Sequence, residues 1–438
     1  SGLPEGAREI DARGRVVTPG GIDAHCHLDQ PSSSPVKMAD DFNSGTISAA
    51  CGGTTTVIPF AAQQKGHSLR AAVEDYHRRA DGESHIDFAF HLIVSDPTPE
   101  VLKVALPELI GKGYTSFKAY MTYDDLKLDD GQILDVLDVA KRHGAIAMLH
   151  AENSDCIEWL TQRLESMGRH APRFHAYSRP MLVEREATHR AIALAELVAV
   201  PILIVHVSGR EAIEQIRWGR AHGLNIFAET CPQYLFLTAE DLGIDDSYTG
   251  AKCVCSPPPR DKANQEFIWN GLRDGLFTVF SSDHAPFNFE GDEGKHPQGK
   301  EVSFRHIPNG IPGLETRMPL LYSEGVLKGR ISLEKFVELT ATGPAKTYGL
   351  HPRKGAICIG ADADLVIWDE REVTIRNGSL HHAVDYTPYE GMRLGAWPAY
   401  TLLRGEVLWD GESYVGSRHR GKFIVAGRPS ILPDVRAS

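Results

Sequence analysis

The sequence repeats one pattern along most of its length: a short β-branched apolar run stops at a polar residue and a helical stretch follows. Such runs are typical of strands buried on both faces, and their alternation with helices favours a parallel sheet. Eight strands are the number that closes a (β/α)8 (TIM) barrel, and an open doubly wound sheet is the alternative. The candidate strands are Gly21–His27, Thr55–Phe60, Ile86–Ile93, Thr115–Tyr120, Ala145–His150, Ile202–Val207, Asn225–Glu229 and Phe277–Asp283.

Apolar residues spaced near a 3.6-residue period predict the helices between these strands. They include Ser68–Ala80, Asp130–His143, Arg185–Leu197, Gly209–His222 and, after the last strand, Leu333–Thr340. The polar residues that end the strands favour the barrel over the open sheet, because only a closed arrangement brings them to one axis. We therefore predict an α/β barrel over residues 20–349.

Both ends of the chain carry a different pattern, in which short strands alternate with Gly, Asp and Asn turns. We predict that residues 1–19 and 350–415 form a small β-sandwich beside the barrel. Residues 416–438 are basic and contain proline, which suggests a tail that packs on a neighbour or stays loose. The expected strands are Glu9–Asp11, Arg15–Thr18, Gly355–Trp368, Arg371–Ile375, Tyr400–Arg404 and Glu406–Trp409.

Composition and charge exclude some classes of binding partner and indicate the cellular compartment. The 438 residues carry a net charge of −12, which disfavours nucleic acid because phosphate binding needs a basic surface. No apolar run approaches the roughly 18 residues of a membrane-spanning helix. Seven scattered cysteines indicate reduced thiols in the cytoplasm. The chain opens at Ser1 without methionine, so we expect a processed or incomplete N-terminus.

His25 and His27 end the first candidate strand in the motif GGIDAHCH. Residues two apart in a strand point to the same side, so both imidazoles face the barrel interior at its carboxyl end. An H-x-H pair alone is also common in cores and on surfaces. Its place at the end of a barrel strand favours metal binding.

Three further strands end in residues that bind metals. His150 ends AIAMLH, His206 ends PILIVH and Asp283 ends FTVFSSD. A single histidine after an apolar strand is more often a satisfied core residue than a ligand. Their recurrence in the same barrel as the H-x-H pair predicts one complete metal site and part of a second.

Lys118 lies in YTSFKAYMTY, among largely apolar neighbours. A buried ammonium costs several kcal/mol, so one interpretation places its amine at the surface, where the side chain reaches water. The other is that carbon dioxide has added to the amine, giving a carbamate whose oxygens bridge two metals. Burial favours that reaction by lowering the amine pKa.

With these residues in place, the chain resembles the cyclic amidohydrolases, and within them the dihydropyrimidinases and D-hydantoinases. The resemblance runs from Val17 to Leu403 and implies a TIM barrel beside a β-sandwich, which in relatives also uses strands ahead of this chain's start. It implies a binuclear site formed by His25, His27, a carboxylated Lys118, His150, His206 and Asp283. The motifs are GGIDAHCH, DDFNSGTISAACGGTTTVIPF, YTSFKAYMTY, LHAEN, VHVSG, ETCPQYL, VCSPPPR, SSDHAPF and IPNGIPGLE.

The resemblance also implies three substrate contacts. Tyr123 matches a tyrosine whose hydroxyl supports the developing oxyanion, and Ser256 and Asn309 match positions whose backbone groups hold the N–C=O edge of the ring. Taken alone, Tyr123 is an ordinary aromatic at the end of a strand, and Ser256 and Asn309 are typical turn residues beside Pro and Gly.

Two departures from the family bear on the substrate. Dihydroorotases carry an arginine two residues after H-x-H, where this chain has Asp29, which argues against dihydroorotate. The Ser- and Pro-rich segment LDQPSSSPVKMADDF follows His27, where relatives vary the loop over the substrate's exocyclic group. Cys26, where many relatives have threonine, is expected to point away from the metals.

The expected reaction is opening of a 5,6-dihydropyrimidine or 5-substituted hydantoin ring to an N-carbamoyl amino acid. Two divalent metals, zinc by preference, lower the pKa of a water between them, with Mn, Co or Ni as alternatives. Asp283 moves the proton and Tyr123 supports the oxyanion. An allantoinase or another cyclic imide hydrolase is the first alternative. A metal-free assembly protein and a purely structural metal site are disfavoured, because all six ligand positions are filled and structural sites use more cysteine. The resemblance also implies a homotetramer or homodimer.

Overall fold

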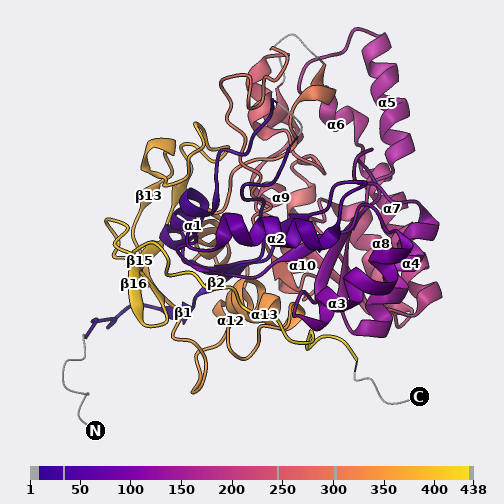
Figure 1. The fold of residues 1–438 in the computed structure, drawn as a ribbon. Helices are drawn as coiled ribbons and strands as arrows, with labels where there is room; N and C mark the ends of the chain where they lie inside the picture. The colour runs from indigo at the N-terminus through magenta and orange to yellow at the C-terminus, as the bar shows by residue number, and fades with distance from the viewer. Residues whose placement is uncertain (1–8, 33–34, 244–245, 300–302, 434–438) are drawn as a thin grey trace.

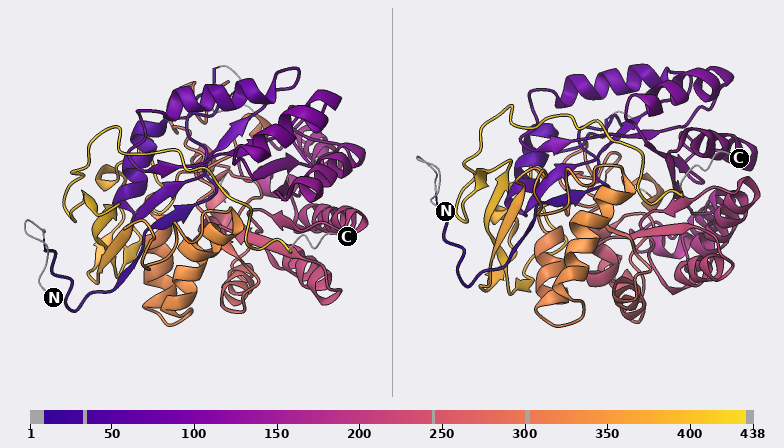
Figure 2. Two further views of the ribbon diagram at one scale, coloured as in Figure 1. Left: turned by 60° about the horizontal axis from the view of Figure 1, so that its bottom comes forward. Right: turned by 90° about the horizontal axis from the view of Figure 1, so that it is seen from below.

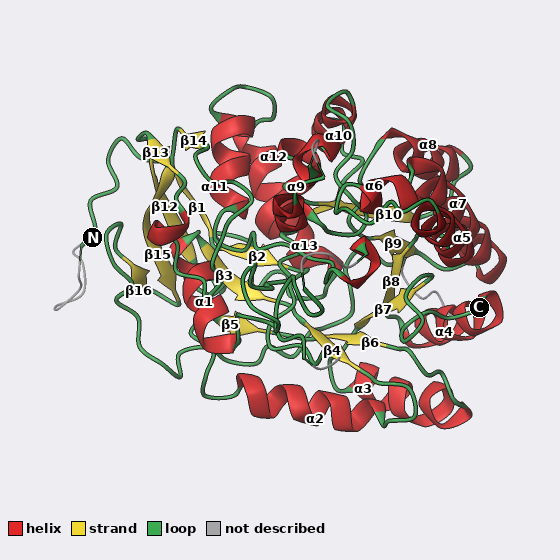
Figure 3. Cartoon of the chain, turned by 90° about the horizontal axis from the view of Figure 1, so that it is seen from above, coloured by secondary structure: helices red, strands yellow, loops and turns green. Residues whose placement is uncertain are grey.

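Two parallel sheets form the centre of the molecule (Figure 3). The computed structural model describes residues 9–32, 35–243, 246–299 and 303–433. The larger sheet has the order β11-β10-β9-β8-β7-β6-β4 and the smaller the order β2-β3-β5. The strands are β2 (Gly21–Asp23), β3 (Thr54–Val57), β4 (Phe60–Ala62), β5 (Asp87–Phe88), β6 (His91–Ile93), β7 (Ser116–Tyr120), β8 (Ile146–His150), β9 (Ile202–Ile204), β10 (Ile226–Thr230) and β11 (Val279–Phe280).

The two sheets continue into one another. β3 and β4 both overlap the predicted strand Thr55–Phe60, and β5 and β6 lie within the predicted strand Ile86–Ile93, so the smaller sheet is an extension of the larger one. At the far edge, a parallel bridge joins Cys26 to His284, and His27 N donates to His284 O at 2.7 Å. The parallel strands therefore curl round until the segment after β11 meets the segment after β2. Each of the eight predicted strands overlaps an observed strand, which is in most cases shorter.

Alternation along the strands separates two layers of core. In β7, Phe117 and Ala119 belong to the cluster that packs against the helices, whereas Tyr120 belongs to the cluster inside the curl with Met148 and Leu203. Lys118 shares the inner side with Tyr120, because residues two apart in a strand face the same way. It is 1% exposed. The sequence therefore directs one amine into the interior of the curled sheet.

Helices cover the outer face of this sheet (Figures 1 and 3). The α-helices of the described part of the chain are α1 (Phe42–Cys51), α2 (Leu69–Ala80), α3 (Leu106–Gly111), α4 (Asp130–His143), α5 (Ser154–Ser166), α6 (Phe174–Ser178), α7 (Met181–Val198), α8 (Arg210–Ala221), α9 (Gln233–Phe236), α10 (Asn264–Arg273), α11 (Arg317–Leu321), α12 (Leu333–Val337) and α13 (Gly343–Thr347), of which α5 and α6 lie above the end of the sheet in Figure 1. Shorter helical turns are η1 (Val101–Ala105), η2 (Ala239–Leu242), η3 (Tyr248–Cys253), η4 (Phe304–His306), η5 (Tyr322–Val326), η6 (Glu338–Thr342) and η7 (Asn377–Ser379). No helix in the described part of the chain combines the length and apolar character needed to cross a membrane.

A four-stranded antiparallel sheet brings the two ends of the chain together. Its order is β1-β12-β15-β16, and Val17 of β1 pairs with Ile367 of β12. In Figure 1 it lies beside the parallel strands, on the side away from α4 and α8. Two further strands, β13 and β14, form a separate two-stranded sheet and lie between β12 and β15 in the chain. The bounds are β1 (Val17–Pro19), β12 (Leu365–Asp369), β13 (Val373–Thr374), β14 (Arg393–Leu394), β15 (Trp397–Leu403) and β16 (Glu406–Trp409).

Two predictions for the chain ends differ from the structure. The predicted strand Gly355–Trp368 begins only at Leu365, because Gly355 and Gly360 turn the chain with φ of 80° and 92°. Glu9–Asp11 forms no strand.

The last described segment, residues 421–432, packs on its own chain in place of the expected loose or neighbour-bound tail. Phe88 N donates to Lys422 O at 3.0 Å, and Ile424 N donates to Phe88 O at 2.7 Å. Ile424 is 1% exposed. Seen from below, this segment runs from the antiparallel sheet across the parallel strands (Figure 2). Its apolar residues supply the reason, since burial against the strands removes them from water.

Candidate metal centre

All six predicted metal ligands converge at the carboxyl end of the curled sheet. Lys118 lies in β7 and His150 ends β8, while the other four follow the ends of β2, β9 and β11. Each is at most 8% exposed. Parallel strands direct their carboxyl ends to one edge, which explains why residues so distant in sequence meet there.

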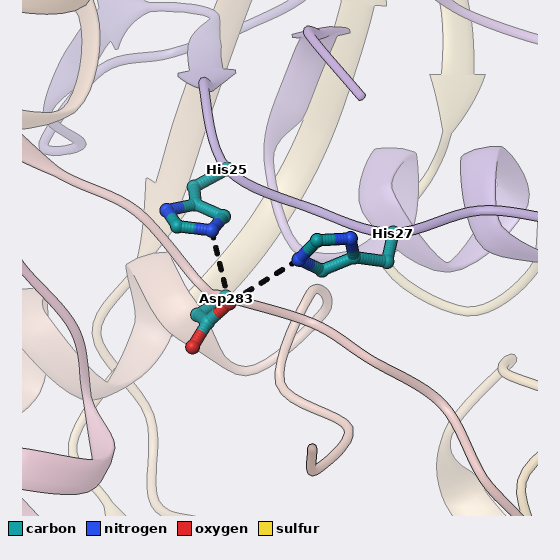
Figure 4. A group of neighbouring side chains, drawn as sticks. All are labelled: His25, His27 and Asp283. Atoms are coloured by element: carbon teal, nitrogen blue, oxygen red, sulfur yellow. Dashed lines mark ion pairs between the residues drawn. The ribbon is translucent and has the colours of Figure 1, made fainter. Parts of the chain in front are cut away.

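His25, His27 and Asp283 form the first group of predicted ligands (Figure 4). Asp283 Oδ1 lies 3.1 Å from His25 Nε2 and 3.6 Å from His27 Nε2. A tetrahedral zinc ion with bonds of about 2.0–2.1 Å places its ligand atoms about 3.3–3.4 Å apart. The spacing of this group therefore fits one divalent metal.

His150 and His206 form a second group, and Lys118 lies between the two. His206 Nε2 is 2.9 Å from His150 Nδ1. Lys118 Nζ is 2.9 Å from His25 Nε2 in the first group. The rings of His25 and His206 are 5.4 Å apart. An anionic group on the Lys118 nitrogen would therefore reach both sets of histidines.

Three of the four histidines are oriented by a second residue. His25 Nδ1 is 2.6 Å from Glu229 Oε1, and His27 Nδ1 is 2.6 Å from Gln30 Oε1. His150 Nε2 is 2.7 Å from Glu152 Oε2. Such contacts fix each ring and leave its other nitrogen toward the centre, as in metal sites.

Sequence reasoning gave none of these outer partners a role. Glu229 closes a predicted strand in the same way as the ligands do, and Glu152 follows His150 by two residues. Their positions beside the strand ends were the feature of the sequence that could have identified Glu229 and Glu152 as partners of the histidines. Gln30 lies in a loop, where the sequence holds no comparable pattern.

The backbone is strained at three predicted site residues. φ is 39° at His206, 50° at Asp283 and 68° at Tyr123. Side-chain-bearing residues rarely adopt positive φ, and such conformations persist only where the surrounding structure imposes them. Here they turn the chain just after a strand, so that the side chain faces the centre.

Burial sets the charges of the site. It lowers the pKa of His25, His150 and His206, which keeps these imidazoles neutral and able to bind a metal. Burial also lowers the pKa of Lys118 to about 8. For Asp283 burial acts in the opposite direction, but the hydrogen bond from His27 and the nearby Lys118 ammonium hold its pKa below the ordinary value.

The centre opens into a cavity of about 710 Å³. All three predicted substrate-contact residues line it, and Asn309 Nδ2 donates to the Tyr123 hydroxyl at 3.4 Å. Ser256 Oγ lies 3.3 Å from His175 Nε2. The other lining residues include Met38 and Phe287, which give part of the wall an apolar surface. The structure thus brings the predicted ligands and the predicted contacts to one space.

Curled parallel strands with histidines, a lysine and an aspartate gathered at their carboxyl ends define a metal-dependent hydrolase. The family model described as "Amidohydrolase family" matches residues 16–408. The chain belongs to this family.

Relatives and solved structures agree. The chain is 47% identical to a D-hydantoinase of Rhizobium radiobacter, covering 95% of this chain and 90% of that protein. It is 45% identical to a D-hydantoinase of Geobacillus stearothermophilus, covering 98% and 90%. The crystal structure of dihydropyrimidinase from Brevibacillus agri superposes with a TM-score of 0.93 at 41% identity, covering 97% of this chain and 91% of that one.

Proposed function

We propose that this enzyme opens the ring of 5-substituted hydantoins or 5,6-dihydropyrimidines by hydrolysis, giving N-carbamoyl amino acids. The observation that carries the proposal is the pair of ligand groups with Lys118 between them, at the base of a cavity lined by Tyr123, Ser256 and Asn309. The names of its relatives, D-hydantoinase and dihydropyrimidinase, support the same class of substrate.

For the fold, we propose that the parallel strands form an eight-stranded (β/α)8 barrel over residues 20–349. The bridge between Cys26 and His284 supports closure of the ring. We propose that residues 1–19 and 350–415 form the accessory β-sandwich, because β1 pairs with β12.

The centre fits two divalent ions, with zinc the first choice for these ligands. His25, His27 and Asp283 would hold one ion, His150 and His206 the other, and a carboxylated Lys118 would join them. The Nδ1 atom of His206 is buried and has no hydrogen-bond partner among the described residues, while its Nε2 lies beside His150 Nδ1. A metal ion bound at this second group would supply a partner for such a buried nitrogen. When bound, such a pair of ions lowers the pKa of a water between them and polarises the ring carbonyl.

The side chains supply the proton transfers and the orientation. The Asp283 carboxylate, held ionised beside His25 and His27, accepts a proton from the attacking water and returns it to the ring nitrogen that leaves. Without that proton the nitrogen is a poor leaving group. The Tyr123 hydroxyl stays protonated, because burial raises its pKa, and donates to the carbonyl oxygen as charge develops there.

Initial rates with dihydrouracil, hydantoin, allantoin and phthalimide test the proposal, on protein supplied with zinc and bicarbonate. We expect dihydrouracil or hydantoin to be preferred. A preference for allantoin or phthalimide would leave the proposed metal centre unchanged but show that the enzyme acts on a different ring. No turnover of any of the four rings by metal-loaded protein would contradict the proposed substrate and indicate that the segment after His27 admits a different ring.

We also propose a homodimer or homotetramer, which light scattering on the purified protein measures. The seven free cysteines support the cytoplasm as its location.

A further inference from the structure

Lys295 is a fully buried lysine outside the metal centre, in the loop after β11. Its ammonium donates to three backbone carbonyls, Val254 O at 2.9 Å and Pro308 O and Gly310 O at 2.6 Å each. No carboxylate of the described residues forms an ion pair with it. Burial lowers the pKa of this ammonium to about 7. Hydrogen bonds from its N–H groups to the three carbonyl oxygens act the other way and stabilise the charged form.

The three carbonyls belong to two segments of the cavity wall. Val254 precedes Ser256 by two residues, and Pro308 and Gly310 flank Asn309. Gly310 N also donates to Val254 O at 3.0 Å. The Val254 oxygen therefore accepts two hydrogen bonds, one from Lys295 and one from Gly310. The ammonium therefore ties residues 254–256 to residues 308–310.

The loop that carries Lys295 is fixed separately. Lys295 N donates to Asn288 O at 2.8 Å, and Lys295 O accepts from the Tyr248 hydroxyl at 2.6 Å. This tight turn requires Gly294, since a Cβ there would lie 2.0 Å from Asn288 O. The backbone of Lys295 is thus held by contacts with Asn288 and Tyr248, which belong to neither of the two segments that its ammonium binds.

Both segments line the cavity, and the segment 308–310 carries an open hydrogen-bonding group. Asn309 Oδ1 is buried and has no partner among the described residues. Ser256, Asn309 and Gly310 all line the cavity that holds the metal centre. A small shift between the segments would therefore change the spacing of the groups that face a bound ring.

We propose that Lys295 is a positioning residue: its ammonium sets the distance between the two backbone segments that hold the N–C=O edge of the substrate. The proposal rests on the proposed function, because Ser256 and Asn309 are contacts only if a cyclic amide occupies the cavity. Lys295 itself touches neither the ring nor the metal ligands. Its loss should therefore weaken ring binding while the chemical step survives.

The test compares Lys295→Met, which keeps the length and removes the charge and donors, with Lys252→Met as a matched control. Lys252 lies two residues before Val254, but its ammonium is 4.5 Å from the centroid of the Phe289 ring. We expect KM of Lys295→Met to rise about tenfold or more with kcat within about threefold, because binding common to ground and transition states is lost. The factor should be the same for hydantoin and dihydrouracil, and the metal content should equal that of the parent. An unchanged KM in folded, metal-loaded Lys295→Met would overturn the proposal.

Amide hydrogen exchange provides a second measurement that needs no activity. Residues 254–256 and 308–310 should exchange faster in Lys295→Met than in the parent, and unchanged exchange would also overturn the proposal. If the parent opens no ring at all, the proposed function fails, while exchange still decides whether Lys295 ties the two segments. If Lys295→Met does not fold, Lys295→Arg serves instead: a guanidinium keeps the charge but not the three-fold geometry, so KM should still rise.

Discussion

Lys118 and Lys354 are both buried, at 1% and 2% exposure, yet their surroundings are opposite. Lys354 Nζ lies 2.6 Å from carboxylate oxygens of Asp87 and Asp364, and these charges raise its pKa although burial acts to lower it. Lys118 Nζ lies beside the nitrogen of His25, and burial prevails, with a pKa of about 8. Burial alone therefore does not decide the state of a lysine.

The difference separates a structural cation from a reactive amine. Lys354 joins the start of β5 to the turn before β12, where a permanent charge between carboxylates holds two regions together. Lys118 lies among imidazoles, and the nearby carboxylates of Asp283 and Glu229 do not offset the effect of its burial, so its amine loses a proton readily and reaches the neutral form that adds carbon dioxide. The following predictions test this contrast.

The largest effect is expected for Lys118→Met. Without the amine no carbamate can form, so we expect the variant to lose bound metal and turnover to fall by about 10⁴-fold or more. Metal analysis of the purified protein and initial rates measure both. The matched Lys354→Met should keep its turnover per folded molecule within about threefold. Substantial turnover by Lys118→Met would contradict the conclusion that Lys118, unlike Lys354, is required for the reaction.

Asp283→Asn should lower turnover by about 10³-fold while the metal is retained, since one carboxylate serves both proton transfers. The amide still offers an oxygen to a metal but cannot accept the proton. Asp364→Asn, which alters a carboxylate on the Lys354 side, is the control and should affect stability instead. Retained turnover in Asp283→Asn would count against the proposed role.

Lys354→Met should lower the free energy of unfolding by about 3–5 kcal/mol, because it leaves the buried Asp364 carboxylate without its cation, whereas Asp87 still pairs with Arg404. Urea denaturation monitored by circular dichroism measures the loss. Removing the charge of Asp364 in the same protein should recover part of it. An unchanged midpoint would mean that the Lys354 network contributes nothing.

The smallest effect concerns pH. The pKa of Lys118 is lowered from 10.5 to about 8, so the neutral amine grows about tenfold per pH unit below 8 and levels off above it. At constant dissolved carbon dioxide, carboxylation of metal-free protein should follow the same curve. ¹³C NMR with labelled carbon dioxide measures it. A rate still rising at pH 10 would identify an ordinary lysine.

Much of the fold follows from local patterns in the sequence. The bounds of α4 agree with the predicted Asp130–His143, because Asp129 and Gln132 form a capping box and Gly144 ends the helix with φ of 68°. The strands were also found, although α1 and α5 were not predicted. The segment Gly355–Trp368 was misjudged because its apolar residues alternate as they would in a strand, while its glycines turn the chain.

The sequence predicted which residues meet at the candidate site, although their role as metal ligands stays a prediction, and it did not predict the residues that support them. Residues that end buried strands, such as His150, carry a pattern that the sequence displays. Lys295 and Gln30 lie in loops, where position depends on tertiary contacts that no local pattern encodes. The packing of residues 421–432 was missed for the same reason.

The pairing of β1 with β12 also constrains how the protein is made. Trp368 Nε1 donates to Thr18 Oγ1 across 350 residues of chain. At a synthesis rate of roughly 5–20 residues per second, the first strand waits about 20–70 seconds for its partner to be translated. During that interval the nascent chain exposes an unpaired strand edge, so chaperone access during translation should determine the yield of folded enzyme.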